Sequence, residues 1–124
     1  MATHDGVRQI ASELDGAIEG EDRFGFSVMV KGKAKGFLWT WAERVHPKKP
    51  KVINDAVIAV VVPNELAKEM LIASNPAIYF TEPHYDGYLA VLVRLDAISV
   101  EELRPLIQEA YSCKLAAPSK RKTS

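Results

Sequence analysis

Apolar residues recur at regular spacings along this chain, and the spacings predict its helices and strands. From Val7 to Ile18 they follow the 3.6-residue period of an amphipathic helix, so a first helix is predicted over residues 5–19. Thr3 or Asp5 lies at its start and can accept hydrogen bonds from the free N–H groups of the first turn.

Two more helices are indicated by their end signals. Asn64 is a suitable N-cap for a helix over residues 65–73, and Asn75 followed by a proline ends that helix. Ser99 and Glu102 have the spacing of a capping box, which predicts the start of a third helix. The second helix is expected to bury Leu66, Met70 and Leu71, and the third to bury Leu103, Leu106, Ile107, Ala110 and Tyr111.

Runs of β-branched and aromatic residues, bounded by turn signals, predict five strands. The predicted strands span residues 24–30, 35–42, 56–62, 77–81 and 88–95. Lys31-Gly32-Lys33 joins the first two as a tight hairpin, in which Gly32 supplies a positive φ at little cost. The predicted order of elements is therefore α-β-β-β-α-β-β-α.

This order predicts the fold class α+β, a two-layer sandwich in which an antiparallel sheet carries both terminal helices on one face. A chain of 124 residues is long enough for one domain with its own core. We expect a single domain of this kind over residues 1–115. Residues 116–124 are poor in large apolar side chains, and we expect them to form a disordered basic tail.

Charge is distributed in blocks, although the formal net charge is zero. Residues 31–51 hold seven Lys and Arg residues against one Glu, and residues 114–124 hold four against none. Such blocks create local electrostatic fields that attract phosphate groups. The alternative interpretation is that the lysines belong to a solvated hairpin and serve only to prevent edge-to-edge strand pairing. The candidate nucleic-acid-binding residues in this part of the chain are Lys31, Gly32, Lys33, Lys35, Lys48, Lys49 and Lys51.

A second turn, between the last two predicted strands, offers aromatic contacts. Tyr85 and Tyr88 can stack on bases or wedge into a groove, whereas Glu82 and Asp86 in the same turn repel phosphate. His84 lies beside these two carboxylates, but a single turn rarely supplies enough ligands for a metal.

Phe37, Trp39 and Trp41 alternate along one predicted strand, so we expect them to share a face of the sheet. Leu38 and Thr40 are expected on the opposite face. If the aromatic face packs on the helices, its residues belong to the core; if it is open, it suits a ligand, a base or a partner protein. In the second case the candidate ligand face comprises Trp39, Trp41 and His84.

Sequence motifs for catalysis are absent: the chain has no nucleophile elbow, P-loop or dinucleotide-binding glycine motif. We therefore expect a non-enzymatic protein with no catalytic residue, no metal site and no cofactor. Cys113, the single cysteine, is expected to be an inert helix residue. Because no signal peptide and no membrane-spanning apolar run is visible, we expect a cytoplasmic protein that does not enter a membrane.

Several segments occur in a recognisable order: residues 26–33, then 80–88 and 89–95, and finally a helix containing Tyr111. In this order the chain, from its first helix to Leu115, resembles the MmcQ/YjbR family of small bacterial proteins. The resemblance implies a frataxin-like (CyaY-like) α+β sandwich and DNA binding through two wing-like hairpins. Together with the charge blocks, the resemblance favours weak, sequence-independent binding of duplex DNA. The alternative is a domain that binds a small ligand or a protein.

Overall fold

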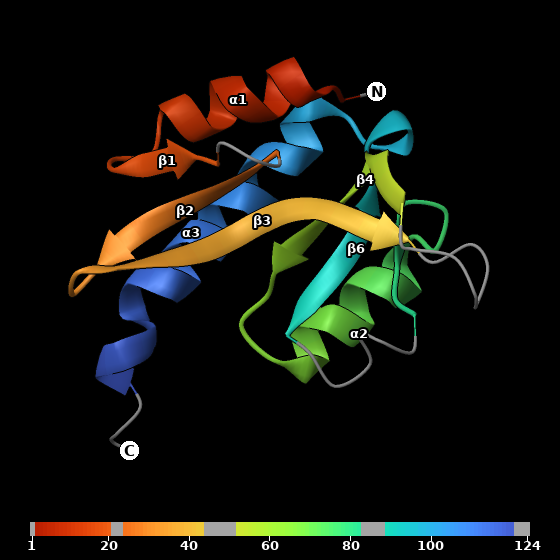
Figure 1. Ribbon diagram of the computed structural model, residues 1–124. Helices are drawn as coiled ribbons and strands as arrows, with labels where there is room; N and C mark the ends of the chain where they lie inside the picture. The colour runs from red at the N-terminus through yellow and green to blue at the C-terminus, as the bar shows by residue number, and fades with distance from the viewer. Residues whose placement is uncertain (1, 21–23, 44–51, 83–88, 121–124) are drawn as a thin grey trace.

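Three helices and six strands make up the computed structural model, which describes residues 2–20, 24–43, 52–82 and 89–120 (Figure 1). In chain order the elements are α1 (His4–Ser12), β1 (Ala17–Glu19), β2 (Gly25–Val30), β3 (Lys33–Glu43), β4 (Val52–Val61), α2 (Glu65–Ser74), β5 (Tyr79–Phe80), β6 (Ala90–Arg94), the 3₁₀ turn η2 (Leu95–Ala97) and α3 (Val100–Lys120). The fold class is α+β, as predicted.

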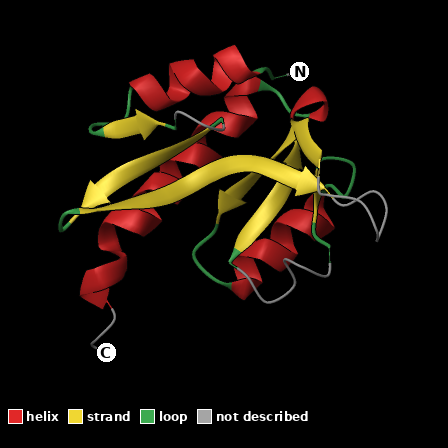
Figure 2. Cartoon of the chain, viewed as in Figure 1, coloured by secondary structure: helices red, strands yellow, loops and turns green. Residues whose placement is uncertain are grey.

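All six strands belong to one sheet, in the order β1-β2-β3-β4-β6-β5 (Figure 2). Every neighbouring pair is antiparallel, which confirms the predicted sheet type. The long strands β3 and β4 lie at the centre, where β-branched residues fill the pleated surface well. After β4 the chain passes through α2 to β5 at the edge of the sheet. It then returns as β6, which lies between β5 and β4.

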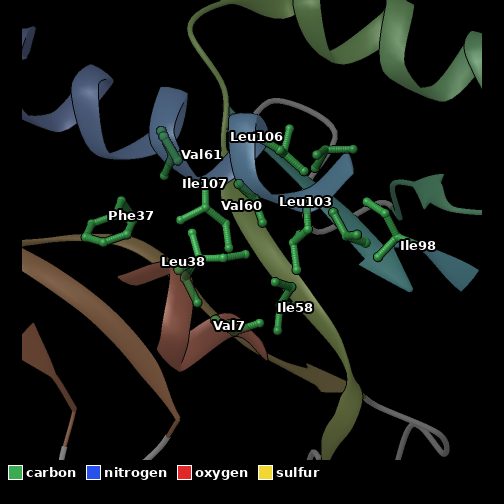
Figure 3. Packing of buried hydrophobic residues seen from close by; sticks show 14 of the residues in the cluster. Val7, Phe37, Leu38, Ile58, Val60, Val61, Ile98, Leu103, Leu106 and Ile107 are labelled. Carbon is green, nitrogen blue, oxygen red and sulfur yellow. The ribbon is translucent and has the colours of Figure 1, made fainter. Parts of the chain in front are cut away.

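The main core lies between the helices and one face of the sheet (Figure 3). Val7 and Ile10 of α1 and Leu103 and Ile107 of α3 are fully buried in it with Ile58 of β4. Each such side chain contributes about 1.5–3 kcal/mol when it leaves water. Because α1 and α3 share this cluster, both terminal helices cover the same face, as predicted.

The helix starts agree with the sequence signals. The Thr3 hydroxyl accepts a hydrogen bond from the Gly6 N–H at 3.1 Å, and Asn64 accepts one from the Ala67 N–H at 2.8 Å. Ser99 accepts from the Glu102 N–H at 3.1 Å, while the Glu102 carboxylate accepts from Ser99. Each cap satisfies N–H groups that the first helical turn leaves without partners.

The prediction of one helix over residues 5–19 is wrong beyond Ser12. The chain turns there, adopts a left-handed conformation at Gly16 (φ 79°) and continues as β1, which pairs with β2. Leu14 and Ala17 still pack against the core, so the turn and strand satisfy the apolar spacing that suggested a helix. The observed order accordingly has one more strand than the predicted order.

The buried face of α2 differs from the predicted one. Leu66 and Met70 are 64% and 62% exposed, whereas Leu71 and its neighbour Ile72 pack against the main core. Lys68, on the same helix, is only 2% exposed. The helix is therefore rotated relative to the orientation that its apolar residues favoured.

The last helix matches its predicted buried positions. Leu103, Leu106, Ile107 and Ala110 are buried, and Tyr111 is partly buried against the same cluster. The helix continues to Lys120, past residue 115, and residues 121–124 lie outside the described part of the chain.

Candidate nucleic-acid interface

The tip of the β2–β3 hairpin is a two-residue turn. Val30 pairs with Lys33, which leaves Lys31 (φ 53°) and Gly32 (φ 80°) as the loop. Positive φ at both positions is typical of a type I′ turn, whose twist matches that of the flanking strands. The predicted hairpin and the positive φ of Gly32 are confirmed. Sequence reasoning named Lys31 as a candidate site residue but did not predict its positive φ, which no other non-glycine residue shares among the described residues.

Strand pairing places the hairpin lysines relative to the helices. Lys33 lies opposite Val30 and Lys35 opposite Val28, and residues directly opposite each other project from the same face. Val28 is buried in the main core, so Lys33 and Lys35 lie on the face that carries the helices. Lys33 is exposed and Lys35 is half-buried, while Lys31 is exposed at the tip.

Lys114 of α3 lies on this same side and was not among the predicted site residues. The Tyr111 and Phe37 rings meet edge to face with centroids 5.8 Å apart, which fixes α3 against β3. Lys114 follows Tyr111 by three residues and therefore lies on the same stripe of the helix. Figure 1 shows α3 crossing behind β2 and β3. The sequence signal that could have placed Lys114 beside the hairpin is its spacing of three residues from Tyr111, which was predicted to be buried.

The four ammonium groups of Lys31, Lys33, Lys35 and Lys114 form no ion pair within the part of the chain that the structure describes. By contrast, Arg8 contacts two carboxylates, those of Asp5 and Glu19, and the hydrogen bonds it donates to Glu19 raise the pKa of Arg8 above its ordinary value. An anion that approaches the hairpin therefore displaces no carboxylate from these lysines.

Trp39 and Trp41 lie on the opposite face of the sheet. Trp39 pairs with Ala59, and the two tryptophans pack against a second, smaller cluster formed by Val57, Ala59, Ala90 and Leu92. The prediction that Phe37 shares their face is wrong, because β3 carries a bulge where the pairing passes from Ser27–Gly36 to Phe26–Leu38. Leu38 and Thr40 do take the face opposite the tryptophans and are buried.

We call Trp39, Trp41, Phe80 and Arg94 the aromatic face. Trp41 and Phe80 meet edge to face with ring centroids 5.5 Å apart. The Arg94 guanidinium lies over the Phe80 ring, 4.0 Å from its centroid, in a cation–π contact. All four side chains are partly exposed, so the rings form a surface rather than a second closed core.

Several predicted site residues lie outside the described residues: Lys48, Lys49, Lys51, His84, Tyr85 and Tyr88. Within the described ranges, no three His, Cys, Asp or Glu side chains are grouped so that they could hold a metal ion. Among the helices described, none is long and apolar enough to cross a membrane.

Comparison with known proteins identifies the fold. No family model matches the chain. A crystal structure of the Deinococcus radiodurans protein DR2400, assigned to the domain family DUF419, has a TM-score of 0.68 and 20% sequence identity, and the match covers 100% of this chain and 83% of that one. DUF419 corresponds to the MmcQ/YjbR family. This likeness shows a common α+β fold.

Two mycobacterial proteins share local sequence similarity with the chain. They are described as uncharacterized protein Mb2600 of Mycobacterium bovis and uncharacterized protein Rv2570 of Mycobacterium tuberculosis. Each is 53% identical over 55 residues, which is 44% of this chain and 43% of the relative. The match thus spans less than half the length of these curated relatives.

Proposed function

We propose that the chain is a member of the MmcQ/YjbR family and that it binds duplex DNA weakly, without sequence preference and without catalysing a reaction. The shared fold with DR2400 supports the family assignment, as does the order of segments in the sequence. Fold alone does not define function, so the binding proposal rests on the side chains of one surface.

The observation that carries the proposal is the group of lysines without ion-pair partners around the hairpin tip. Lys31 and Lys33 lie at the tip of the β2–β3 hairpin, Lys35 follows on β3, and Lys114 lies on the same side of the sheet. None of the four has a carboxylate partner among the described residues. Lysines that contact phosphates release condensed counterions, and this release drives most non-specific DNA binding. Affinities of this kind have Kd values of about 10⁻⁴ to 10⁻⁶ M at physiological salt.

The shape of the tip suits close approach to a duplex. Nothing lies within 4 Å of the position that a Cβ atom of Gly32 would occupy, so the end of the ribbon is open. A two-stranded ribbon fits the major groove of B-DNA, which is about 12 Å wide. Lysines act as point charges on phosphates and carry little base-specific information, which explains the expected lack of sequence preference.

Fluorescence anisotropy of a labelled duplex, measured at two salt concentrations, tests the proposal. The triple variant K31Q/K33Q/K35Q should bind more weakly and lower the slope of log K against log salt by about 2.7, or 0.9 for each phosphate that a lysine no longer neutralises. Arg8→Gln is the matched control, because it removes a positive charge that two carboxylates already neutralise. Equal binding by the wild type and the triple variant would contradict the proposal.

A second candidate function, binding of a small ligand or a protein, is favoured by the partly exposed rings of the aromatic face. Docking on aromatic rings buries apolar surface and should depend little on salt. It would therefore survive the triple lysine change and be lost when the tryptophans are replaced.

A further inference from the structure

One half of the sheet face opposite the helices carries an apolar patch on β1, β2 and β3. Strand pairing sets Ile18 opposite Ser27 and Met29 opposite Ala34, and Ser27 in turn lies opposite Gly36. Residues directly opposite each other project from the same face, so these five residues form one group. We call them the sheet patch.

The sheet patch faces away from the main core. Val28, which lies between Ser27 and Met29 in β2, is buried in that core, so its two neighbours project from the other face. Figure 1 shows α3 behind β2 and β3, and none of the described helices lies in front of them. The side chains of Ile18 and Met29 remain 48% and 50% exposed. Apolar surface left open in this way marks an interaction site.

The absence of charge indicates what this surface can bind. When two copies of one chain meet through the same surface, charges near the symmetry axis approach their own counterparts and repel. The sheet patch contains no charged residue. The exposed Leu66 and Met70 of α2, by contrast, have the exposed carboxylates of Glu65 and Glu69 beside them in the helix. The sheet patch therefore suits a second copy of the chain, whereas the surface of α2 does not.

The shape of the sheet patch is self-complementary. Ile18 and Met29 have large side chains, while Ser27 and Ala34 have small ones and Gly36 has none. Sheets that pack face to face lie about 10 Å apart, and their side chains interdigitate. Under two-fold symmetry, Met29 of each copy can lie over Ala34 of the other copy and fill the space beside it.

The size of the face limits the strength of such a contact. Six strands about 4.8 Å apart are about 24 Å wide, and β2 is about 20 Å long, so the whole open face covers roughly 500 Å² per copy. A standard stable interface buries about 800 Å² per partner. The contact should therefore be weak and reversible.

We propose that the sheet patch binds a second copy of this chain and forms a weak, two-fold symmetric dimer in which the open sheet faces meet. The two β2–β3 hairpins run in opposite directions, because the parallel arrangement would bring the exposed Lys31 of one copy beside that of the other. Lys33 and Lys35 project from the face that carries the helices, so the dimer leaves them uncovered. The inference goes beyond the proposed function and does not depend on it.

Sedimentation equilibrium of the full chain, from micromolar to millimolar concentration, tests the dimer. The average mass should rise from 13.7 kDa, the mass of one chain, toward twice this value. Met29→Lys and Met29→Glu each place like charges across the axis, and each should weaken association at least about tenfold. An equimolar mixture of the two variants should associate again, since opposite charges then face each other. Leu66→Lys, which adds the same charge to an exposed apolar position on α2, is the matched control and should associate as the wild type does.

Ile18→Lys, in a different strand of the sheet patch, should also weaken association and makes the test independent of how Met29 affects folding. A wild-type mass that stays at the value of one chain up to millimolar concentration would overturn the inference. Association that is lost in Leu66→Lys but kept in both Met29 variants would also overturn it, because the interface would then lie on α2. A mass that grows past two chains would contradict the two-fold arrangement, since only unlike surfaces associate without end.

The DNA proposal and the dimer can fail separately. The triple variant K31Q/K33Q/K35Q should lose DNA affinity and still associate, because none of its changes lies in the sheet patch. A monomeric wild type that binds duplex DNA would overturn the dimer and leave the proposed function in place.

Discussion

Phe37 and Trp39 are two residues apart in β3, yet their side chains lie on opposite faces of the sheet. The bulge beside Ser27 inserts one extra residue in β3, so the regular alternation of the strand is broken between Phe37 and Leu38. Phe37 consequently meets Tyr111 of α3 in the main core, whereas Trp39 lies on the aromatic face. One irregularity in strand pairing thus places one aromatic residue fully inside the main core and the other, only partly buried, on the opposite face of the sheet.

This separation predicts a large difference between two aromatic substitutions. Phe37→Ala removes a fully buried ring and should lower the free energy of unfolding by about 3–5 kcal/mol. Trp41→Ala removes a partly exposed ring and should cost clearly less. Urea unfolding of the two variants checks the prediction, and equal losses would show that the two faces are equally important for folding.

The sequence predicted the features that depend on near neighbours. Gly32 and its flanking strands are enough to specify a hairpin, and Ser99 with Glu102 is enough to specify a helix start. These signals work because the groups that interact lie within a few residues of one another in the chain.

The features that sequence reasoning missed depend on distant partners. The position of Phe37 is set by pairing with β2, and the extended form of Ile18 is set by pairing with the same strand. The spacing of apolar residues around Ile18 fits a helix equally well, so only the tertiary context decides. Lys114 belongs to the candidate site for a similar reason. The rings of Tyr111 and Phe37, which are far apart in the chain, are in contact, and this contact places α3, with Lys114, behind the hairpin.

Lys31 offers a test in which stability and binding change in opposite directions. A lysine at φ 53° is strained, whereas Asn adopts this conformation readily and Asn-Gly is a favoured type I′ pair. Lys31→Asn should therefore raise the free energy of unfolding by up to about 1 kcal/mol. Because the change also removes one cation from the tip, it should weaken duplex binding. Chemical denaturation and anisotropy on the same protein sample measure both effects, and a loss of stability would argue against strain at this residue.

Two glycines beside Trp39 should respond differently to alanine. A Cβ atom at Gly25 would lie 2.9 Å from the Leu38 carbonyl oxygen, and this backbone atom cannot move without disturbing the sheet. Gly25→Ala should therefore lower the free energy of unfolding by about 1–3 kcal/mol.

Gly36→Ala serves as the matched control, since its new methyl group would meet Trp39 at 3.7 Å, an ordinary contact distance. Its unfolding midpoint should stay near that of the wild type. If Gly36→Ala were as unstable as Gly25→Ala, the space between Gly36 and the Trp39 ring would also be too tightly packed to accept a methyl group.

Tyr79 predicts how stability depends on alkaline pH. Burial of its hydroxyl, together with the nearby Glu102 carboxylate, raises the pKa of Tyr79 above its ordinary value of 10.0. The folded protein therefore holds this proton more tightly than the unfolded chain does, so the contribution to stability is complete below about pH 10 and is lost as the pH rises through the folded-state pKa. Tyr79→Phe has no proton to lose, and its free energy of unfolding should fall less steeply between about pH 9 and 11 than that of the wild type. Urea titrations at closely spaced pH values in this range measure the two slopes, in which the ionisation of the lysines contributes equally to both proteins. Parallel slopes would show that Tyr79 ionises equally easily in the folded and unfolded states.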